Sequence, residues 1–129
     1  MFCRFLNMEF FQTKVVIATH YLVYGAPQAL RDYLIANRVH KLLFIAQPLY
    51  ADNNLSYIEV IENGKVKDKR IFHTRTRISV INYFFEIFLI LKLVINSQET
   101  FDLFIGVDNL NTFSGLILRI LGRVRKVIY

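Results

Sequence analysis

The stretch VVIATHYLVYGAPQALRDYL, Val15–Leu34, decides the fold. Its apolar start belongs to the β-branched run Lys14–Thr19, which is typical of a strand covered on both faces. A loop with Gly25 follows, and Pro27 suits the first turn of a helix, where a missing N–H costs nothing. Lys41–Ala46 (KLLFIA) is a second strand of the buried type. The short connections between these elements predict two parallel strands with a right-handed helical crossover.

A β-hairpin is predicted next, because the Asn-Gly pair at 63–64 suits a two-residue turn in which both positions need a positive φ. Its strands are expected over 56–62 and 65–72. In that register Glu59 opposes Asp68, which is an unfavourable pair of like charges. We expect this hairpin to extend one edge of the sheet.

The most apolar segment, Arg77–Asn96, is expected to form one long helix. One side of its helical wheel carries the polar residues Ser79, Asn82, Glu86 and Asn96, with Lys92 at the border. This pattern predicts a helix that is buried on most of its circumference. Central Glu and Lys residues are costly in hydrocarbon and argue against a membrane span. A helix that rests on a membrane surface or on a partner is the alternative.

Three elements complete the domain. Phe101–Val107 is predicted to be a strand, and Asn109 or Asn111 is expected to cap the helix that follows, with Asp108 as an alternative cap. The inner face of that helix is expected to consist of Phe113, Leu116, Ile117, Ile120 and Leu121. A last strand is expected to start at Val127, and only three residues remain there. Since parallel strands are usually longer, we expect a chain truncated from a longer one.

Composition sets the class of protein. The chain has 129 residues, enough for one domain, and 54% of them are hydrophobic, which excludes a disordered protein. Lys and Arg number 16 against 10 Asp and Glu, and they cluster at 65–77 and 119–126. Such a surface attracts phosphate, nucleic acid or anionic lipid, or it is only a solvated rim. The single cysteine, Cys3, excludes an intrachain disulfide, and the histidines lie too far apart to suggest a metal site.

Ligands of doubly wound sheets bind beyond the carboxyl ends of the strands, and three loops are expected there. They carry the candidate ligand-binding residues His20, Tyr24, Gly25, Gln47, Asp108, Asn109 and Asn111. The preferred interpretation of His20 is a loop residue bonded to the backbone, with a general base as the alternative. Asp108 is interpreted as a residue that takes a proton or holds a hydroxyl group, or else as a helix cap. The glycine fingerprints of nucleotide-binding loops and a recognisable Ser/His/Asp set are absent, so catalytic residues stay unassigned.

The order of these elements resembles the N-terminal domain of GT-B glycosyltransferases of the large family-four type. VVIATHYLVYGAPQALRDYLI is similar to the first strand, glycine loop and first helix of that domain. FDLFIGVDNLNTFSGLILRILGRVRKVIY is similar to its later strand, polar loop, apolar helix and Val-Ile-Tyr strand. The likeness covers 14–129, and 1–13 is an N-terminal extension that starts at Met1 or Met8. The expected fold is therefore α/β: a Rossmann-like, doubly wound, mostly parallel sheet with a β-hairpin insertion and helices on both faces.

The resemblance implies one half of a sugar-transferring enzyme. In this family the N-terminal domain recognises a glycan or lipid-linked acceptor, often in cell-envelope polysaccharide synthesis, and a C-terminal domain, absent here, holds the nucleotide-sugar. Gly25 would approach the donor phosphates, and Asp108 and Asn109 would line the acceptor side. Several relatives carry a histidine where this chain has Val107. The resemblance implies no cofactor and no nucleic-acid partner.

We therefore expect the acceptor-side half of a glycosyltransferase, inactive as this chain alone. Its expected location is the cytoplasm, with peripheral contact at the inner face of the membrane. The alternative is a non-enzymatic α/β module that docks to a membrane surface or to a protein partner.

Overall fold

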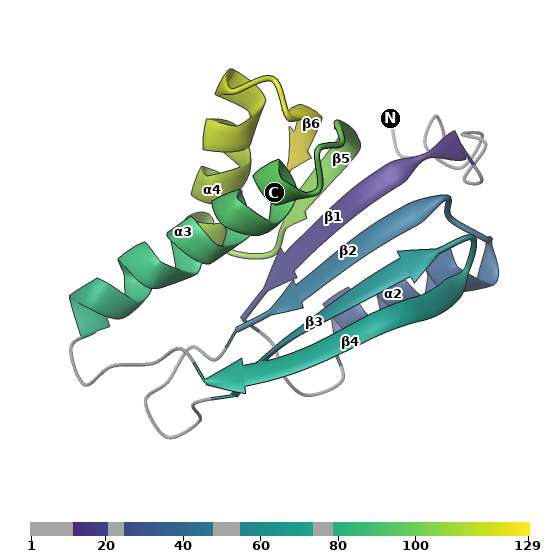
Figure 1. Cartoon of the computed structure of the whole chain (residues 1–129), viewed down its shortest axis with the longest axis horizontal. Helices are drawn as coiled ribbons and strands as arrows, with labels where there is room; N and C mark the ends of the chain where they lie inside the picture. Colours follow the sequence, from purple (N-terminus) through teal and green to yellow (C-terminus); the bar gives the residue numbers. More distant parts are fainter. Residues whose placement is uncertain (1–11, 21–24, 48–54, 74–78) are drawn as a thin grey trace.

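The computed structural model describes residues 12–20, 25–47, 55–73 and 79–129. They form an α/β fold with a six-stranded sheet in the order β4-β3-β2-β1-β5-β6 and three α-helices (Figure 1). The strands are β1 (Lys14–Thr19), β2 (Lys41–Ala46), β3 (Leu55–Glu62), β4 (Lys65–His73), β5 (Phe101–Gly106) and β6 (Val124–Ile128). The helices are α2 (Ala26–Ala36), α3 (Ser79–Asn96) and α4 (Asn109–Ile120).

The sheet is mixed. β1 is central and pairs in parallel with β2 on one side and with β5 on the other, and β6 pairs in parallel with β5. β3 and β4 form the predicted hairpin and add two antiparallel pairings beyond β2. The parallel unit predicted from Val15–Leu34 is confirmed, and so are the bounds of its two strands.

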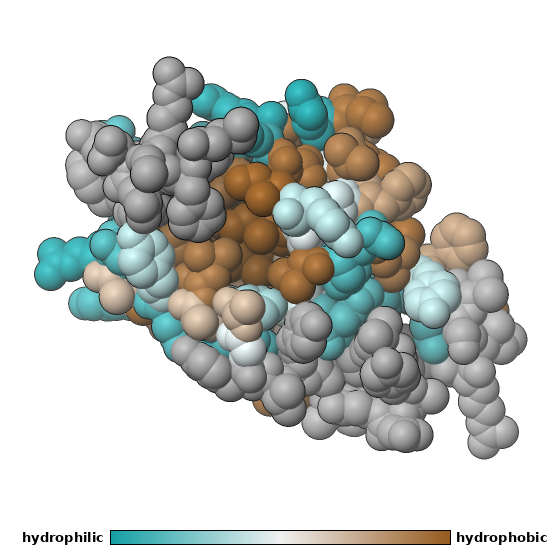
Figure 2. All heavy atoms as spheres, turned by 180° about the vertical axis from the view of Figure 1, so that it is seen from behind, coloured by the Kyte–Doolittle hydropathy of each residue, from teal (hydrophilic) through white to brown (hydrophobic). Residues whose placement is uncertain are grey.

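Helices cover both faces of the sheet. Val15 and Ile17 of β1 belong to the core cluster that includes Leu34 of α2. Val16 and Ala18 point to the other face and belong to the cluster built by α3 and α4. In the view from behind, hydrophobic residues gather in the middle of the molecule (Figure 2). The strand β1, buried from both sides, therefore needs the continuous apolar run that its sequence shows.

The helix α3 turns its polar side toward the sheet, so the prediction of a helix buried around most of its circumference is wrong. Asn82 and Glu86 are buried, on the same side as Ile90 and Val94, each four residues from the next. The opposite side exposes Ile81, Phe84, Phe85, Phe88 and Ile95. No helix in the described ranges combines the length and the apolar character that crossing a membrane requires.

The helix α4 is turned in a similar way. Its buried residues are Asn111, Ser114, Gly115 and Leu118, whereas Phe113, Leu116, Ile120 and Leu121 are exposed. The predicted inner face is therefore wrong, apart from the half-buried Ile117. The reason is close packing: a Cβ atom at Gly115 would lie 2.5 Å from the ring of Phe104 in β5. The small-residue side of α4 lets the helix approach the strand, and a row of large side chains would hold it away.

The hairpin has the predicted turn, with φ values of 53° at Asn63 and 75° at Gly64. Its register differs from the prediction, because a β-bulge between Val60 and Ile61 makes Glu59 oppose Lys69. The predicted contact between like charges at 59 and 68 does not form.

The last strand also differs from the prediction. β6 begins at Val124, three residues before Val127, and pairs with β5 from Phe101 onward. It has five residues, an ordinary strand length. A short final strand therefore no longer supports the expected truncation.

Substitutions on the two sides of α3 test its orientation. Ile90 is 1% exposed, and Ile90→Ala is expected to lower the free energy of unfolding by about 2–5 kcal/mol because it leaves a cavity. Phe88 is 63% exposed, and Phe88→Ala is expected to change that free energy by less than about 0.5 kcal/mol. Chemical denaturation of the two variants measures both effects. A larger loss for Phe88→Ala would show that α3 is rotated the other way.

Candidate functional site

The carboxyl ends of β1 and β5 lie side by side. Ala18 pairs with Gly106, and the N–H of Val107 donates to the carbonyl oxygen of Ala18 at 3.1 Å. The loops after these two strands therefore share one edge of the sheet, as predicted. From this edge α2 leads to one face of the sheet and α4 to the other.

A buried charge cluster joins this edge to α3. The ring atom Nδ1 of His20 lies 2.8 Å from Oδ2 of Asp108, and Nε2 lies 2.9 Å from Oε2 of Glu86. The side chains of His20 and Glu86 are 7% and 6% exposed, and that of Asp108 is 30% exposed. The partners of His20 are thus two carboxylates, and the preferred interpretation of a backbone-bonded residue is wrong.

The cluster changes the pKa values of its members. Burial alone lowers the pKa of His20, but the hydrogen bonds and charges of Asp108 and Glu86 outweigh it and raise the pKa to about 9. Burial raises the pKa of Asp108, but hydrogen bonds from His20 and Asn111 outweigh it and hold that pKa below its usual value. At neutral pH His20 is therefore a cation that donates from both ring nitrogens. Such a ring cannot accept a proton, which argues against a general base.

Asp108 is the N-cap of α4. Its Oδ1 accepts from the backbone N–H of Asn111 at 3.0 Å, and its Oδ2 accepts from the Nδ2 group of Asn111 at 2.6 Å. The prediction that Asn109 or Asn111 caps the helix is wrong, because both lie inside its first turn, and the alternative cap is confirmed. Asn111 is buried, and Asn109 is exposed at the first helical position.

Gly106 allows α4 to begin close to the end of β5. A Cβ atom at this position would lie 2.6 Å from the backbone nitrogen of Thr112. The hydroxyl of Thr112 also donates to the carbonyl oxygen of Asp108 at 2.7 Å. A larger residue would displace the turn that holds Asp108 against His20.

Gly25 has a different environment. It is the N-cap of α2, with a φ of −160°, an extended conformation open to any residue. The nearest atom to an added Cβ would be 3.7 Å away. Its N–H donates to Oε1 of the buried Gln28 at 3.0 Å. The described residues therefore leave room for a side chain at position 25. Tyr24, the other candidate in this loop, lies outside the described residues.

Gln47 adds a polar group to the same edge. Its backbone N–H donates to the carbonyl oxygen of Thr19 at 3.0 Å, next to His20. The side chain is 1% exposed, and neither its Oε1 nor its Nε2 has a hydrogen-bond partner in the described part of the chain. A buried amide left unpaired costs about 1–3 kcal/mol, and such groups often mark a site that a ligand or an ion completes.

The structure thus brings three of the predicted residues together, because Asp108 contacts both His20 and Asn111. Gly25 and Asn109 start the two helices that leave the same edge. Glu86 was not predicted, because a charged residue in an amphipathic pattern is normally assigned to the solvent side. The one feature of the sequence that could have indicated its burial is its position four residues after Asn82 and four before Ile90, which places all three on one side of α3.

No group of three or more His, Cys, Asp or Glu side chains within the described ranges is arranged to hold a metal ion. In the His20 cluster, the two carboxylates bond opposite nitrogens of one ring, so their oxygens do not converge on a common point.

Comparison of the chain with protein-family models, curated proteins and solved structures gives no match. Any function assigned to it therefore depends on the geometry of its own residues.

The His20 cluster predicts a dependence of stability on pH. Because the folded-state pKa of about 9 exceeds the ordinary value of 6.5, protonation of His20 stabilises the fold fully below pH 6.5. This stabilisation is lost as the pH rises through about 9. Urea denaturation between pH 6 and 10 should show the loss in the parent chain and not in His20→Gln. The control His40→Gln, at an exposed position before β2, should keep it. Equal pH dependence in the parent chain and His20→Gln would contradict the cluster.

Two glycine substitutions at the same edge should differ in effect. Gly106→Ala is expected to lower the free energy of unfolding by about 1–3 kcal/mol, because the new methyl group collides with the backbone of Thr112. Gly25→Ala should change it by less than about 0.5 kcal/mol, because the added atom meets only ordinary contacts. Thermal or urea denaturation compares them. Equal losses would mean that the edge is packed differently.

Proposed function

We propose that the chain is a Rossmann-like, doubly wound domain that serves as the acceptor-side half of a glycosyltransferase. The acceptor is a glycan or a lipid-linked saccharide, and the nucleotide-sugar is held by a second, C-terminal domain. The observation that carries this proposal is the convergence of His20, Asp108 and Asn111 at the edge shared by β1 and β5. The helices after these strands lead to opposite faces, and α/β sheets bind ligands in the crevice at such a switch point.

The chemistry of this edge suits a ligand rich in hydroxyl groups. Asp108 is partly exposed and is held in one orientation by His20 and Asn111, so a hydroxyl meets a fixed acceptor. Asn109 is exposed beside it and carries both a donor and an acceptor. The buried amide of Gln47 offers a second such pair near Thr19. Fixed donors and acceptors of this kind select a hydroxyl pattern better than mobile ones.

The same geometry explains why we propose an inactive chain. Sugar transfer needs donor and acceptor aligned and the leaving diphosphate stabilised. His20 is already charged and donates to two carboxylates, so it activates no acceptor hydroxyl. The proposed location is the cytoplasmic side of a membrane, where a lipid-linked acceptor presents its sugar, and we propose neither a cofactor nor a nucleic-acid partner.

A second candidate function is a non-enzymatic α/β module that docks to a membrane surface or to a protein partner. Two observations favour this docking module: His20 is already paired with a carboxylate, and α3 and α4 expose large apolar residues. In this case the His20 cluster at the edge of β1 and β5 only stabilises the fold and binds no ligand.

Nuclear magnetic resonance titration tests the proposed function. The isotopically labelled chain is titrated with a short-chain polyprenyl-phosphate-linked sugar and, separately, with nucleotide-sugars. We expect amide shifts at Asp108 and Asn109 with the acceptor, weaker shifts with nucleotide-sugars, and no transfer product. Shifts confined to the hairpin turn at 63–64 would refute the acceptor site, and sustained turnover would refute the inactive state.

The two buried glutamines form a matched pair. Gln47→Leu removes an amide that has no hydrogen-bond partner among the described residues, so it should leave the melting temperature unchanged or raise it by a few degrees. Gln28→Leu removes the acceptor of the Gly25 N–H and should lower the melting temperature. If Gln47 contacts the acceptor, Gln47→Leu also weakens acceptor binding about fivefold or more. Unchanged binding together with a lower melting temperature would show that its amide is structural.

A further inference from the structure

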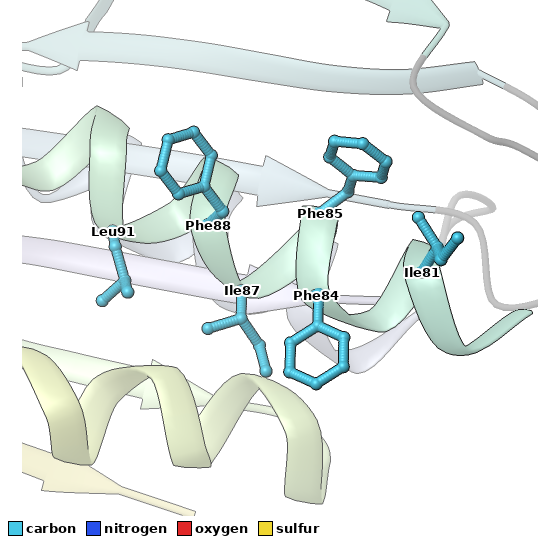
Figure 3. Close-up of a pocket in the computed structure, with 6 residues that line it drawn as sticks. All are labelled: Ile81, Phe84, Phe85, Ile87, Phe88 and Leu91. Carbon is cyan, nitrogen blue, oxygen red and sulfur yellow. The ribbon is translucent and has the colours of Figure 1, made fainter.

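The helices α3 and α4 contact one another on one face of the sheet, and the outer side of each exposes large apolar residues. On α3 these are Ile81, Phe84, Phe85 and Phe88, and on α4 they are Phe113, Leu116 and Ile120; we call this set the α3–α4 surface. Phe84 is 69% and Ile120 is 84% exposed. Figure 3 shows the side chains that line a hollow along α3, with Ile87 and Leu91 on the side where α4 lies and Phe85 and Phe88 on the other. Large exposed apolar surfaces of this kind usually mark an interaction site.

The charges on these two helices have one sign. Lys92 is exposed and lies four residues after Phe88, on the same side of α3. Arg119 is exposed in the last turn of α4. Within the described residues, the only carboxylate on either helix is that of Glu86, which is buried against His20. The α3–α4 surface therefore presents apolar side chains and cations together, without exposed anions.

This charge pattern favours an anionic lipid surface over a second copy of the chain. Two copies that met through the α3–α4 surface would bring Lys92 and Arg119 toward like charges, with no exposed carboxylate on either helix to pair with them, because Glu86 is buried against His20. A bilayer of anionic lipid supplies the opposite charge in its headgroups and an apolar layer beneath them. Helices that lie in this interface bury aromatic and aliphatic side chains and keep Lys and Arg at headgroup level.

We propose that the α3–α4 surface docks on an anionic lipid bilayer, with both helices lying along it. Glu86 faces the candidate site, and Phe84, Phe85 and Phe88 leave the same stretch of α3 on its other side. Docking thus brings the edge of β1 and β5 near the headgroups. Only this last step depends on the proposed transferase function, and the docking itself does not.

Vesicle co-sedimentation tests the docking. Phosphatidylglycerol vesicles and pure phosphatidylcholine vesicles, both without any glycolipid, are mixed with the parent chain and with variants. We expect binding to the anionic vesicles, a loss of about tenfold or more in Phe84→Glu/Phe88→Glu, and about fivefold for each of Lys92→Gln and Arg119→Gln. The control Tyr33→Glu changes an exposed aromatic residue of α2, on the other face of the sheet, and should bind like the parent chain.

A fluorescent reporter gives a second measurement that distinguishes insertion into the bilayer from unfolding of the chain. The chain contains no tryptophan, so Phe88→Trp introduces a single one, and Tyr33→Trp is the matched control. The emission of Phe88→Trp should shift to shorter wavelength and be quenched by brominated lipid, and that of Tyr33→Trp should not. Circular dichroism checks that each variant is folded.

Several results would overturn the proposal. Equal binding to phosphatidylcholine and phosphatidylglycerol vesicles would show that Lys92 and Arg119 do not contribute to docking through anionic headgroups. Binding that is lost in Lys67→Gln/Lys69→Gln of the hairpin and kept in Phe84→Glu/Phe88→Glu would assign docking to the basic edge instead. A dimer in sedimentation analysis that Phe84→Glu/Phe88→Glu dissociates would assign the surface to a second copy. Because the vesicles carry no sugar acceptor, none of these results depends on transfer.

Discussion

The ion pair between Glu86 and His20 fixes the orientation of α3, and the candidate site and the exposed surface both follow from it. A carboxylate removed from water without a partner costs several kcal/mol, and Nε2 of His20, 2.9 Å away, offsets this cost. His20 follows the end of β1, on the sheet. Glu86 can reach it only from the side of α3 that faces the sheet, so the opposite side, with Phe84 and Phe88, is left to the outside.

The sequence predicts local structure correctly where its residue types are compatible with one conformation. The strands at Lys14–Thr19 and Lys41–Ala46 were predicted to the residue, because short, continuous apolar runs between turn signals suit strands buried on both faces. The bulge between Val60 and Ile61 was not predictable. Oε1 of Glu59 lies 3.0 Å from Nη1 of Arg31 in α2. Rules for pairing residues across a hairpin consider only its two strands, so they cannot include a contact with a helix.

The candidate site was predictable in part for a related reason. Parallel pairing of β1 and β5 is enough to bring His20 and Asp108 to one edge, since the carboxyl ends of parallel strands coincide. Glu86 lies 66 residues from His20 and was missed, because hydrophobic periodicity assigns charged residues to solvent. The same rule failed for α4, where Gly115 and Ser114 face inward and the large apolar residues face out. In both helices, close packing and polar pairing on the inner side outweigh the hydrophobic effect on the outer side.

One helix therefore separates two different environments. The body of α3 is about 10–12 Å across including its side chains, so Glu86 and the exposed aromatic rings beside it in sequence are separated by little more than one helix diameter. Rotating α3 to bury those rings would withdraw the carboxylate from His20 and leave a buried cation with one partner, Asp108. A buried charge that loses a partner is strongly destabilising, often by about 3–5 kcal/mol. The apolar surface is thus exposed because the polar cluster beneath α3 requires that orientation, and the two features can only change together.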